Sequence, residues 1–378
     1  MKRVIISALV TLLTPTLASA QLSGNGFYRV QNNASQRYIT INDDIIGEVN
    51  TSSTTADLSN IITWRGFDYV KSNPASVIYI ESVGNKYNLS AQGTSVYKIT
   101  GGRTYIDITN KGGNTYEISV SYSGAKIKLY DDSKSADKGG VRQSSSNQSY
   151  ALWRMTPINT SDNYLGLQPT VKVADDEYYG TLFADYAFKR VSEGIKIYYI
   201  NAESEGKCRL KEITSEVIPA ATPIIFKCSS NDPAQNMIMP VTDAAEKPTD
   251  NYLAGTFFAS TTNKHLRYQV YDDASMHVLG LGADGQLSFV TAKSTDLVND
   301  GQHIPMNTCW LRLFNGITGD LTVLNEELYA GIRTIETDNQ AAGTDKQGIY
   351  TLTGVKVDES QQLKPGIYIQ NGKKMVIK

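Results

Sequence analysis

The feature that most constrains the fold is a strand–turn–strand pattern that recurs three times near the start of the chain. In each copy, two short runs alternate apolar and polar side chains on either side of a polar turn. The paired runs are residues 27–31 with 37–41, 77–81 with 87–89, and 116–120 with 126–130. Alternation with a period of two predicts half-buried strands, and a short polar turn between two such runs predicts a hairpin. The pattern therefore predicts three hairpins of similar design between residues 24 and 158.

Composition supports β structure for the rest of the chain as well. The 378 residues include 23 Tyr, against 9 Phe and 3 Trp, and 40% of the chain is hydrophobic. Aromatic and β-branched residues favour half-buried strand positions. The net charge of −2 gives no electrostatic reason to expect nucleic-acid binding. With only three His and three Cys, we expect no metal site and no cofactor.

The run FYRVQNNASQRYITI at residues 27–41 resembles the repeat opening of ricin-type β-trefoil lectins. In that family three copies bury one shared apolar axis, and an aspartate just after the second strand holds sugar hydroxyls. The resemblance implies a trefoil-like domain over residues 24–158 that binds glycans or other host surface ligands. It places the candidate ligand-binding residues after the second strand of the first and third copies, at Asn42, Asp43, Asp44, Asp131 and Asp132. The alternative for these residues is a solvated turn.

Two tryptophans in the same region stand just before or after the predicted hairpins. Trp64 lies in the run IITWR and Trp153 lies in the run ALWRM. Because Trp is highly buried on average, we expect core packing for both rings and not ligand contact.

The middle of the chain, residues 159–320, carries signs of a duplication. The tetrapeptide DNYL at residues 162–165 recurs at residues 250–253, and the pattern IPxxT at residues 218–222 recurs at residues 304–308. The two offsets, 88 and 86 residues, are nearly equal, which is the signature of an internal repeat. We therefore predict two related sandwich-like units, at about 162–226 and 250–313, with their Ile-Pro motifs at equivalent bends.

Two cysteines lie symmetrically about Ile218, the expected bend of one hairpin. Cys208 and Cys228 would then face each other across paired strands. In an exported protein such a pair can oxidise to a disulfide. Two small buried thiols are the alternative, and the third cysteine, Cys309, is expected to be a core thiol.

The first 20 residues predict export. Lys2 and Arg3 precede an apolar run that ends in the small residues Ala-Ser-Ala at 18–20, which is the pattern of a secretory signal peptide. No later stretch reaches the roughly 18 consecutive apolar residues that a spanning helix needs. We therefore expect an exported protein with no stable membrane span.

The last segment, residues 334–378, reads as a polar linker followed by short strands with strong turn signals, including an Asn-Gly dipeptide at 371–372. Its pattern, IYTLTGVKV followed by LKPGIYIQNGKKMVIK, resembles the C-terminal sorting domain of type IX secretion cargo in the Bacteroidetes. The residues that carry this resemblance are Gly354, Gly366, Tyr368, Lys373, Lys374 and Lys378. It implies that the outer-membrane secretion machinery reads the tail and delivers the protein to the outer-membrane surface or the medium. Residues 321–333 could supply the first strands of this sorting domain. The alternative is a small accessory β domain without sorting function.

Common catalytic signatures are absent from the sequence. It contains no His-Glu-x-x-His, no Gly-x-Ser-x-Gly and no P-loop. We therefore predict an all-β, non-catalytic binding protein of the cell surface. Two alternatives stay open: a structural or adhesive protein with no sugar site, and a divergent glycoside hydrolase or peptidase, since two suitably spaced carboxylates need no sequence motif.

Overall fold

A computed structural model gives the architecture of the chain. It describes residues 22, 24–41, 62–95, 105–122, 124–131, 141–144, 149–257, 269–298, 301–314, 319–330, 348–351, 356–357, 363, 365–370 and 373–377. The predicted signal segment, Asn42, Asp43, Asp44, Asp132, the linker at 334–346, Gly354 and Lys378 lie outside the described residues. The described part consists of β-strands in four sheets with a few short helices, so the all-β prediction is confirmed.

The N-terminal region forms a closed barrel of six strands. They are β1 (Gly26–Asn32), β4 (Ile78–Val83), β5 (Lys86–Ala91), β7 (Asp107–Gly112), β8 (Thr115–Tyr122) and β11 (Leu152–Pro157). β1 pairs with β4 and β11, β4 pairs with β5, and β8 pairs with β7 and β11. An antiparallel bridge between Tyr87 and Ile106 joins β5 to the residue before β7. The ring therefore leaves no unpaired barrel edge.

The remaining strands of this region lie between barrel strands, one set in each copy. They are β2 (Tyr38–Ile41) with β3 (Ile62–Arg65), β6 (Thr94–Ser95), and β9 (Ala125–Asp131) with β10 (Val141–Ser144). Each of the three copies thus begins and ends with a barrel strand, which is the plan of a β-trefoil. Short helical segments complete the region: α1 (Phe67–Val70), η2 (Pro74–Ser76) and η3 (Ser149–Ala151).

One tryptophan anchors the trefoil core. Trp153 is fully buried and packs in the same cluster as Tyr28, Val30 and Ile118. Its indole nitrogen donates a hydrogen bond to the carbonyl oxygen of Leu129 at 3.0 Å, so the polar atom of a buried ring is satisfied. Core packing is therefore confirmed for Trp153.

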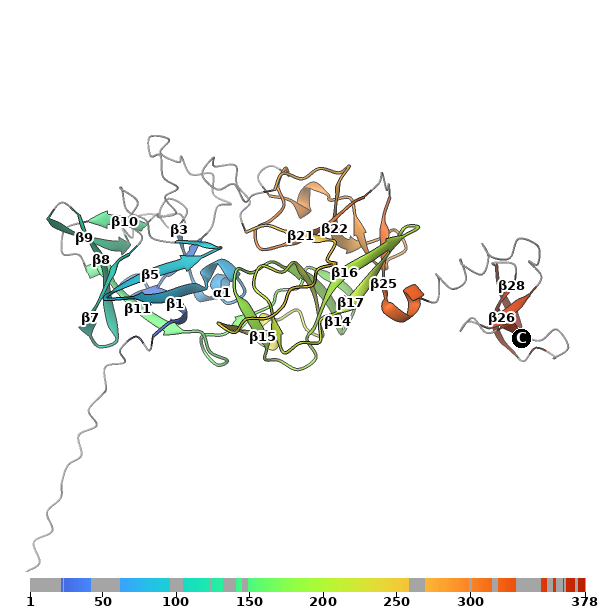
Figure 1. Ribbon diagram of the computed structural model, residues 1–378, viewed down its shortest axis with the longest axis horizontal. Coiled ribbons are helices and arrows are strands. Elements are labelled where there is room, and N and C mark those ends of the chain that lie inside the picture. Colours follow the sequence, from blue (N-terminus) through green and yellow to red (C-terminus); the bar gives the residue numbers. More distant parts are fainter. Residues whose placement is uncertain are drawn as a thin grey trace, which may run out of the picture.

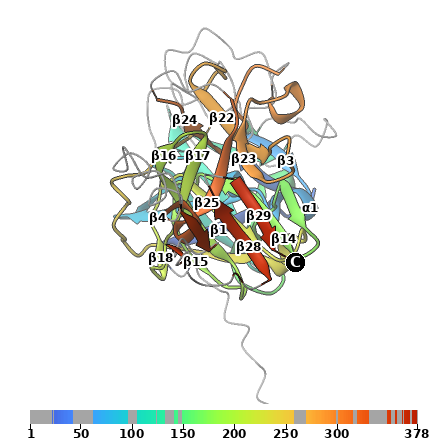
Figure 2. The ribbon, with the colours of Figure 1, turned by 90° about the vertical axis from the view of Figure 1, so that its right-hand side faces the viewer.

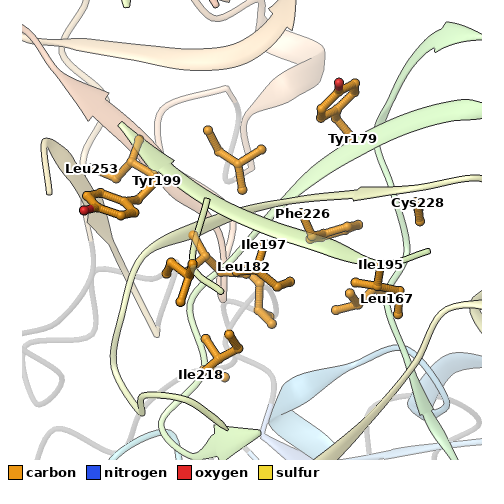
Figure 3. Packing of buried hydrophobic residues seen from close by; sticks show 14 of the residues in the cluster. Leu167, Tyr179, Leu182, Ile195, Ile197, Tyr199, Ile218, Phe226, Cys228 and Leu253 are labelled. Atoms are coloured by element: carbon orange, nitrogen blue, oxygen red, sulfur yellow. The ribbon is translucent and has the colours of Figure 1, made fainter. Parts of the chain in front are cut away.

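The first unit of the middle region is a sandwich of two sheets. One sheet has the order β12 (Leu165–Gly166), β20 (Met237–Val241), β15 (Ala187–Arg190), β18 (Val217–Ile218). The facing strands are β13 (Val171–Ala174), β14 (Glu177–Leu182), β19 (Ile224–Cys228), β16 (Lys196–Ser204) and β17 (Lys207–Glu212), in that order. Buried side chains from both sheets, among them Leu182, Ile197 and Ile218, fill the space between them (Figure 3).

The second unit continues the larger sheet. Its strands are β21 (Leu253–Gly255), β22 (Met276–Leu281), β23 (Leu287–Val290) and β24 (Cys309–Arg312), with the short helix η5 (Ser294–Asp296) between β23 and β24. β25 (Leu321–Asn325) lies between the units, parallel to β17 and antiparallel to β23, and Figure 1 shows it beside β17. Residues 321–325 therefore belong to the middle region and not to the tail.

The two units share one pairing order. In the first it is β14-β19-β16-β17, and in the second β21-β24-β22-β23. The second residue after each Ile-Pro proline has left-handed backbone: φ is +48° at Ala221 and +57° at Asn307. The glycines of the two matching hairpins also agree, with φ of +75° at Gly206 and +76° at Gly285.

The DNYL marker, however, does not align the two units. Leu165 begins β12, which pairs with β20 in the smaller sheet, whereas Leu253 begins β21, which pairs with β24 in the larger one. The matching strands are β14 and β21: Gly-Thr at 180–181 lies in β14, and Gly255 ends β21 with Thr256 directly after it. The prediction that the two DNYL tetrapeptides occupy equivalent positions was therefore wrong.

The proposed disulfide does not form in this structure. Cys208 and Cys228 are free and buried, as is Cys309. The expected hairpin about Ile218 is wrong, because β16 lies between β17 and β19 in the sheet. Burial raises the pKa of Cys208, so the thiol form is favoured there.

The described tail residues form a four-stranded antiparallel sheet in the order β27 (Lys356–Val357), β26 (Ile349–Thr351), β28 (Gly366–Gln370), β29 (Lys373–Ile377). Gly366 and Tyr368 lie on β28, and Lys373 and Lys374 begin β29 beside it (Figure 2). Within the described part of the chain, no helix has the length and apolar character needed to cross a membrane.

Candidate functional site

One side of the trefoil is held against the middle region by a buried arginine. Arg29, on β1, has no solvent exposure. Its guanidinium donates hydrogen bonds to Asn163 Oδ1 at 3.0 Å, to the carbonyl of Tyr164 at 2.7 Å and to the carbonyl of Val70 at 2.8 Å. Burial lowers the pKa of Arg29 to about 10. The acceptors named here are uncharged, so this cation joins the two regions through neutral oxygens.

A second contact joins the trefoil to the other unit. Gln92, just after β5, donates from its amide nitrogen to Asn307 Oδ1 at 2.7 Å and to the carbonyl of Phe257 at 2.8 Å. Asn307 donates in return to Gln92 Oε1 at 2.9 Å. Both residues are buried. We call the surface that carries Arg29 and Gln92 the joined face of the trefoil, and its polar groups bind within the chain.

Another side of the barrel carries a row of polar and aromatic side chains that we call the outer row: Asn25, Glu81, Asn88 and Tyr105. Strand register places them side by side. Glu81 pairs with Asn88, the Tyr87–Ile106 bridge sets Asn88 opposite Tyr105, and the Gly26–Ile80 pair sets Asn25 opposite Glu81. Since inward neighbours such as Ile80 and Leu89 are buried, alternation directs the row outward.

The outer row combines an exposed aromatic ring with hydrogen-bonding groups. The Tyr105 side chain is 53% exposed, and an exposed ring can stack on the CH face of a pyranose. The Asn88 amide both donates and accepts hydrogen bonds, and the Glu81 carboxylate accepts them from hydroxyl groups. Asn25 is oriented by the backbone, because its Oδ1 accepts a hydrogen bond from the Ser82 amide at 2.8 Å. Glu81 and Asn88 lie on barrel strands, Asn25 directly precedes β1, and Tyr105 directly precedes the bridged residue Ile106.

A second ladder runs beside the outer row, two residues further along the strands. Lys86 contacts Asp107, with 2.6 Å between Nζ and Oδ1. Asp107 pairs with Ser119, and Ser119 pairs with Lys128. Lys86 is two residues from Asn88 and Asp107 is two residues from Tyr105, so these side chains point to the same side of the sheet. Ser119 and Lys128 share that side, because directly paired residues on neighbouring strands face the same way.

Glu117, on β8, gathers three lysines next to this ladder. Its carboxylate lies 2.8 Å from Lys128 Nζ, 3.0 Å from Lys126 Nζ and 3.7 Å from Lys111 Nζ. Desolvation acts to raise the pKa of Glu117, but the hydrogen bonds from Lys128 and Lys126 outweigh it, so its pKa lies below the usual value of 4.5. We call Lys86, Lys111, Lys126, Lys128, Asp107, Glu117 and Ser119 the lysine patch.

The one carboxylate of the lectin resemblance that the structure describes fully has a structural role. Asp131, at the end of β9, has no solvent exposure, and both of its oxygens accept hydrogen bonds from Arg37, at 3.2 Å and 2.5 Å. A carboxylate that is buried and bound in two places cannot hold sugar hydroxyls, and it does not lie in a solvated turn. The expectation of ligand binding at Asp131 was therefore wrong.

The residues of the outer row and the lysine patch were missed by sequence reasoning. The sequence resemblance directed attention to loops after the second strand, whereas both groups lie on barrel strands or next to them. Alternation in residues 77–81 and 87–89 marks Glu81 and Asn88 as outward residues. Nothing in the sequence sets them opposite Tyr105, because that depends on the Tyr87–Ile106 bridge.

Among the described residues, no group of three His, Cys, Asp or Glu side chains is placed to hold a metal ion.

Similarity to known proteins comes from solved structures. Neither a protein-family model nor a curated protein matches the chain. Among solved structures, the chain is similar to ThreeFoil, a designed three-fold symmetric protein, at 16% identity and a TM-score of 0.26. The match covers 35% of this chain and 99% of that one. The trefoil-like fold of the N-terminal region rests on the strand pairing given above.

Proposed function

We propose that this protein is a non-catalytic, exported binding protein and that the outer row of its trefoil binds glycans. The observation that carries the proposal is the exposed Tyr105 ring beside Asn88 and Glu81 on paired strands. Ring stacking would hold the apolar face of a sugar, and the amide and carboxylate would select its hydroxyl groups.

The fixed placement of the trefoil supports this assignment. Arg29 and Gln92 join the barrel to both units of the middle region, so the outer row is held on a rigid support. Preorganised side chains lose little conformational entropy when a ligand binds. That matters for sugars, whose individual contacts are weak.

The tail fits delivery to the cell surface. Its strands pair only with one another among the described residues, so the described part of the tail forms a sheet separate from the middle region. We propose that the predicted signal peptide carries the chain across the inner membrane. The outer-membrane secretion machinery would then read the tail through Gly366, Tyr368, Lys373 and Lys374.

Glycan binding is tested with the mature chain, residues 21–378, on a glycan array. Binding to at least one glycan is expected, with an affinity that falls up to about tenfold in Tyr105→Ala, since one stacked ring contributes about 0.5–1.5 kcal/mol beyond its buried area. The matched control is Tyr69→Ala, another exposed tyrosine, on α1. Absence of binding to every glycan would refute the proposal and leave a structural or adhesive role. Equal losses in the two variants would also refute it.

The sorting role is tested by deleting residues 348–378 and fractionating the cells. The truncated chain should accumulate in the periplasm while keeping the melting temperature of the full-length chain. A truncated chain that reaches the surface would show that the tail is not a sorting signal.

A further inference from the structure

The lysine patch holds more positive charge than its carboxylates can balance. One carboxylate neutralises one ammonium group, yet Glu117 lies within 4 Å of three lysines. With the Lys86–Asp107 pair included, the patch comprises four lysines and two carboxylates among the residues that the structure describes, a net charge of +2. The whole chain has a net charge of −2, so this surplus is local. It indicates that the patch takes an anionic ligand group.

A buried hydroxyl in the middle of the patch supports the same conclusion. Ser119 has no solvent exposure, and its Oγ has no hydrogen-bond partner among the described residues. Its register neighbours are Asp107 and Lys128. A buried hydroxyl without a partner is costly to the fold. A ligand oxygen that displaced a lysine side chain would give it an acceptor.

The lysines are able to move toward a ligand. The side chains of Lys86, Lys111 and Lys126 are 38%, 38% and 44% exposed. Lysine is a point charge on a flexible stem, so these three can leave their carboxylates without unfolding the barrel. Lys128, only 13% exposed, stays on Glu117 and keeps that carboxylate paired.

The patch and the outer row form one continuous surface. Lys86 is two residues from Asn88 on β5, and Asp107 is two residues from Tyr105. Such neighbours lie about 7 Å apart on the same side of a strand. One sugar residue stacked on Tyr105 would therefore place its substituents, or the next sugar, over the lysines.

We propose that the lysine patch binds the sulfate or carboxylate groups of an acidic polysaccharide whose sugar ring stacks on Tyr105. This inference rests on the proposed function, because it names the class of glycan that the outer row accepts. The lysines select the charged groups, the Ser119 hydroxyl donates one hydrogen bond, and Asn88 and Glu81 contact neighbouring hydroxyls.

The test measures the affinity of the mature chain for three polymers: heparin, which is sulfated, alginate, which carries only carboxylates, and dextran, which is neutral. Binding to at least one acidic polymer is expected, at least tenfold tighter than to dextran. It should weaken when salt rises from 50 to 200 mM, because salt screens partly exposed charges. Because heparin carries both sulfate and carboxylate groups and alginate carries only carboxylates, tighter binding to heparin would show that sulfate groups add to the affinity.

Variants place the binding on the patch. The double variant Lys111→Gln/Lys126→Gln should lower affinity for the acidic polymer about tenfold. The control Lys172→Gln/Lys189→Gln removes the same charge from the middle region, where both lysines have carboxylate partners. It should change the affinity for the acidic polymer less than twofold. Ser119→Ala should lower affinity several-fold without loss of stability, because it removes a hydroxyl that lacks a partner in the free protein.

The outcomes separate this inference from the proposed function. Tyr105-dependent binding with no preference for acidic polymers would overturn the inference alone. Equal losses in the patch and control variants would show nonspecific attraction and would also overturn it. No binding to any glycan would overturn both.

Discussion

The joined face and the outer row belong to the same barrel, yet they treat polar groups in opposite ways. On the joined face, Arg29 and Gln92 are buried and hydrogen-bonded to partners from residues 163–164, 257 and 307. On the outer side, Tyr105 is exposed and the lysine patch holds surplus charge. The difference separates the two sides of one barrel: the joined face binds its polar groups to the middle region, whereas the outer row and the lysine patch are the surfaces for which we propose ligand binding.

The largest expected effect comes from breaking the joined face at Arg29. Arg29→Ala leaves a cavity and removes the donor from Asn163 Oδ1 and from the carbonyls of Val70 and Tyr164. Loss of one partner from a buried charged network costs about 3–5 kcal/mol of unfolding free energy. Urea denaturation measures it.

The control for Arg29 is Arg190→Ala in the middle region. Arg190 also donates to backbone carbonyls, but from a partly exposed position. Its removal should cost below about 1 kcal/mol. Equal losses in the two variants would contradict the view that the joined face holds the trefoil in place.

Gln92→Leu should have the next largest effect. The substitution keeps the size and the left-handed backbone of residue 92, whose φ is +54°, but leaves the buried Asn307 side chain without that partner. An unsatisfied buried amide costs about 1–3 kcal/mol. Thermal melts of Gln92→Leu and of the exposed control Gln168→Leu compare the two. A decrease in melting temperature as small as that of the control would show that Arg29, and not Gln92, holds the trefoil to the middle region.

The lysine patch predicts a pH dependence of stability. The pKa of Glu117 in the folded protein lies below its usual value of 4.5. A lowered carboxyl pKa means that Glu117 stabilises the fold at neutral pH and that this contribution is lost as pH falls below about 4.5. Unfolding free energy measured from pH 6 to pH 3 should therefore decline more steeply in the wild type than in Glu117→Gln. Parallel profiles would contradict the role of the lysines in holding this carboxylate.

The smallest effect on stability is expected at Tyr105. Because its ring is 53% exposed, Tyr105→Ala should change the unfolding free energy by less than about 0.5 kcal/mol, although we expect the same substitution to weaken the proposed glycan binding. Urea denaturation of Tyr105→Ala and of Arg29→Ala measures the two losses of unfolding free energy under the same conditions. A large loss of stability at Tyr105 would mean that the outer row supports the barrel.

Local patterns in the sequence determined much of the architecture. Alternation and turn residues predicted the three hairpins, and the buried Trp153 followed from the average burial of tryptophan. The Ile-Pro motifs at 218–219 and 304–305 marked two bends with matching left-handed residues. These features depend on neighbours in the chain, and short-range sterics and side-chain alternation are visible in a sequence.

Only the tertiary structure decided which strands pair across long separations. Symmetry about Ile218 suggested that Cys208 and Cys228 face each other, but β16 lies between their strands. The sequence placed Asp131 at a ligand site, whereas Arg37, 94 residues away, binds it within the fold. Tyr105 meets Asn88 through one bridge, and Glu117 meets lysines from β7 and β9. Such contacts depend on barrel closure and strand register, which the burial of all the strands sets together and no single segment encodes.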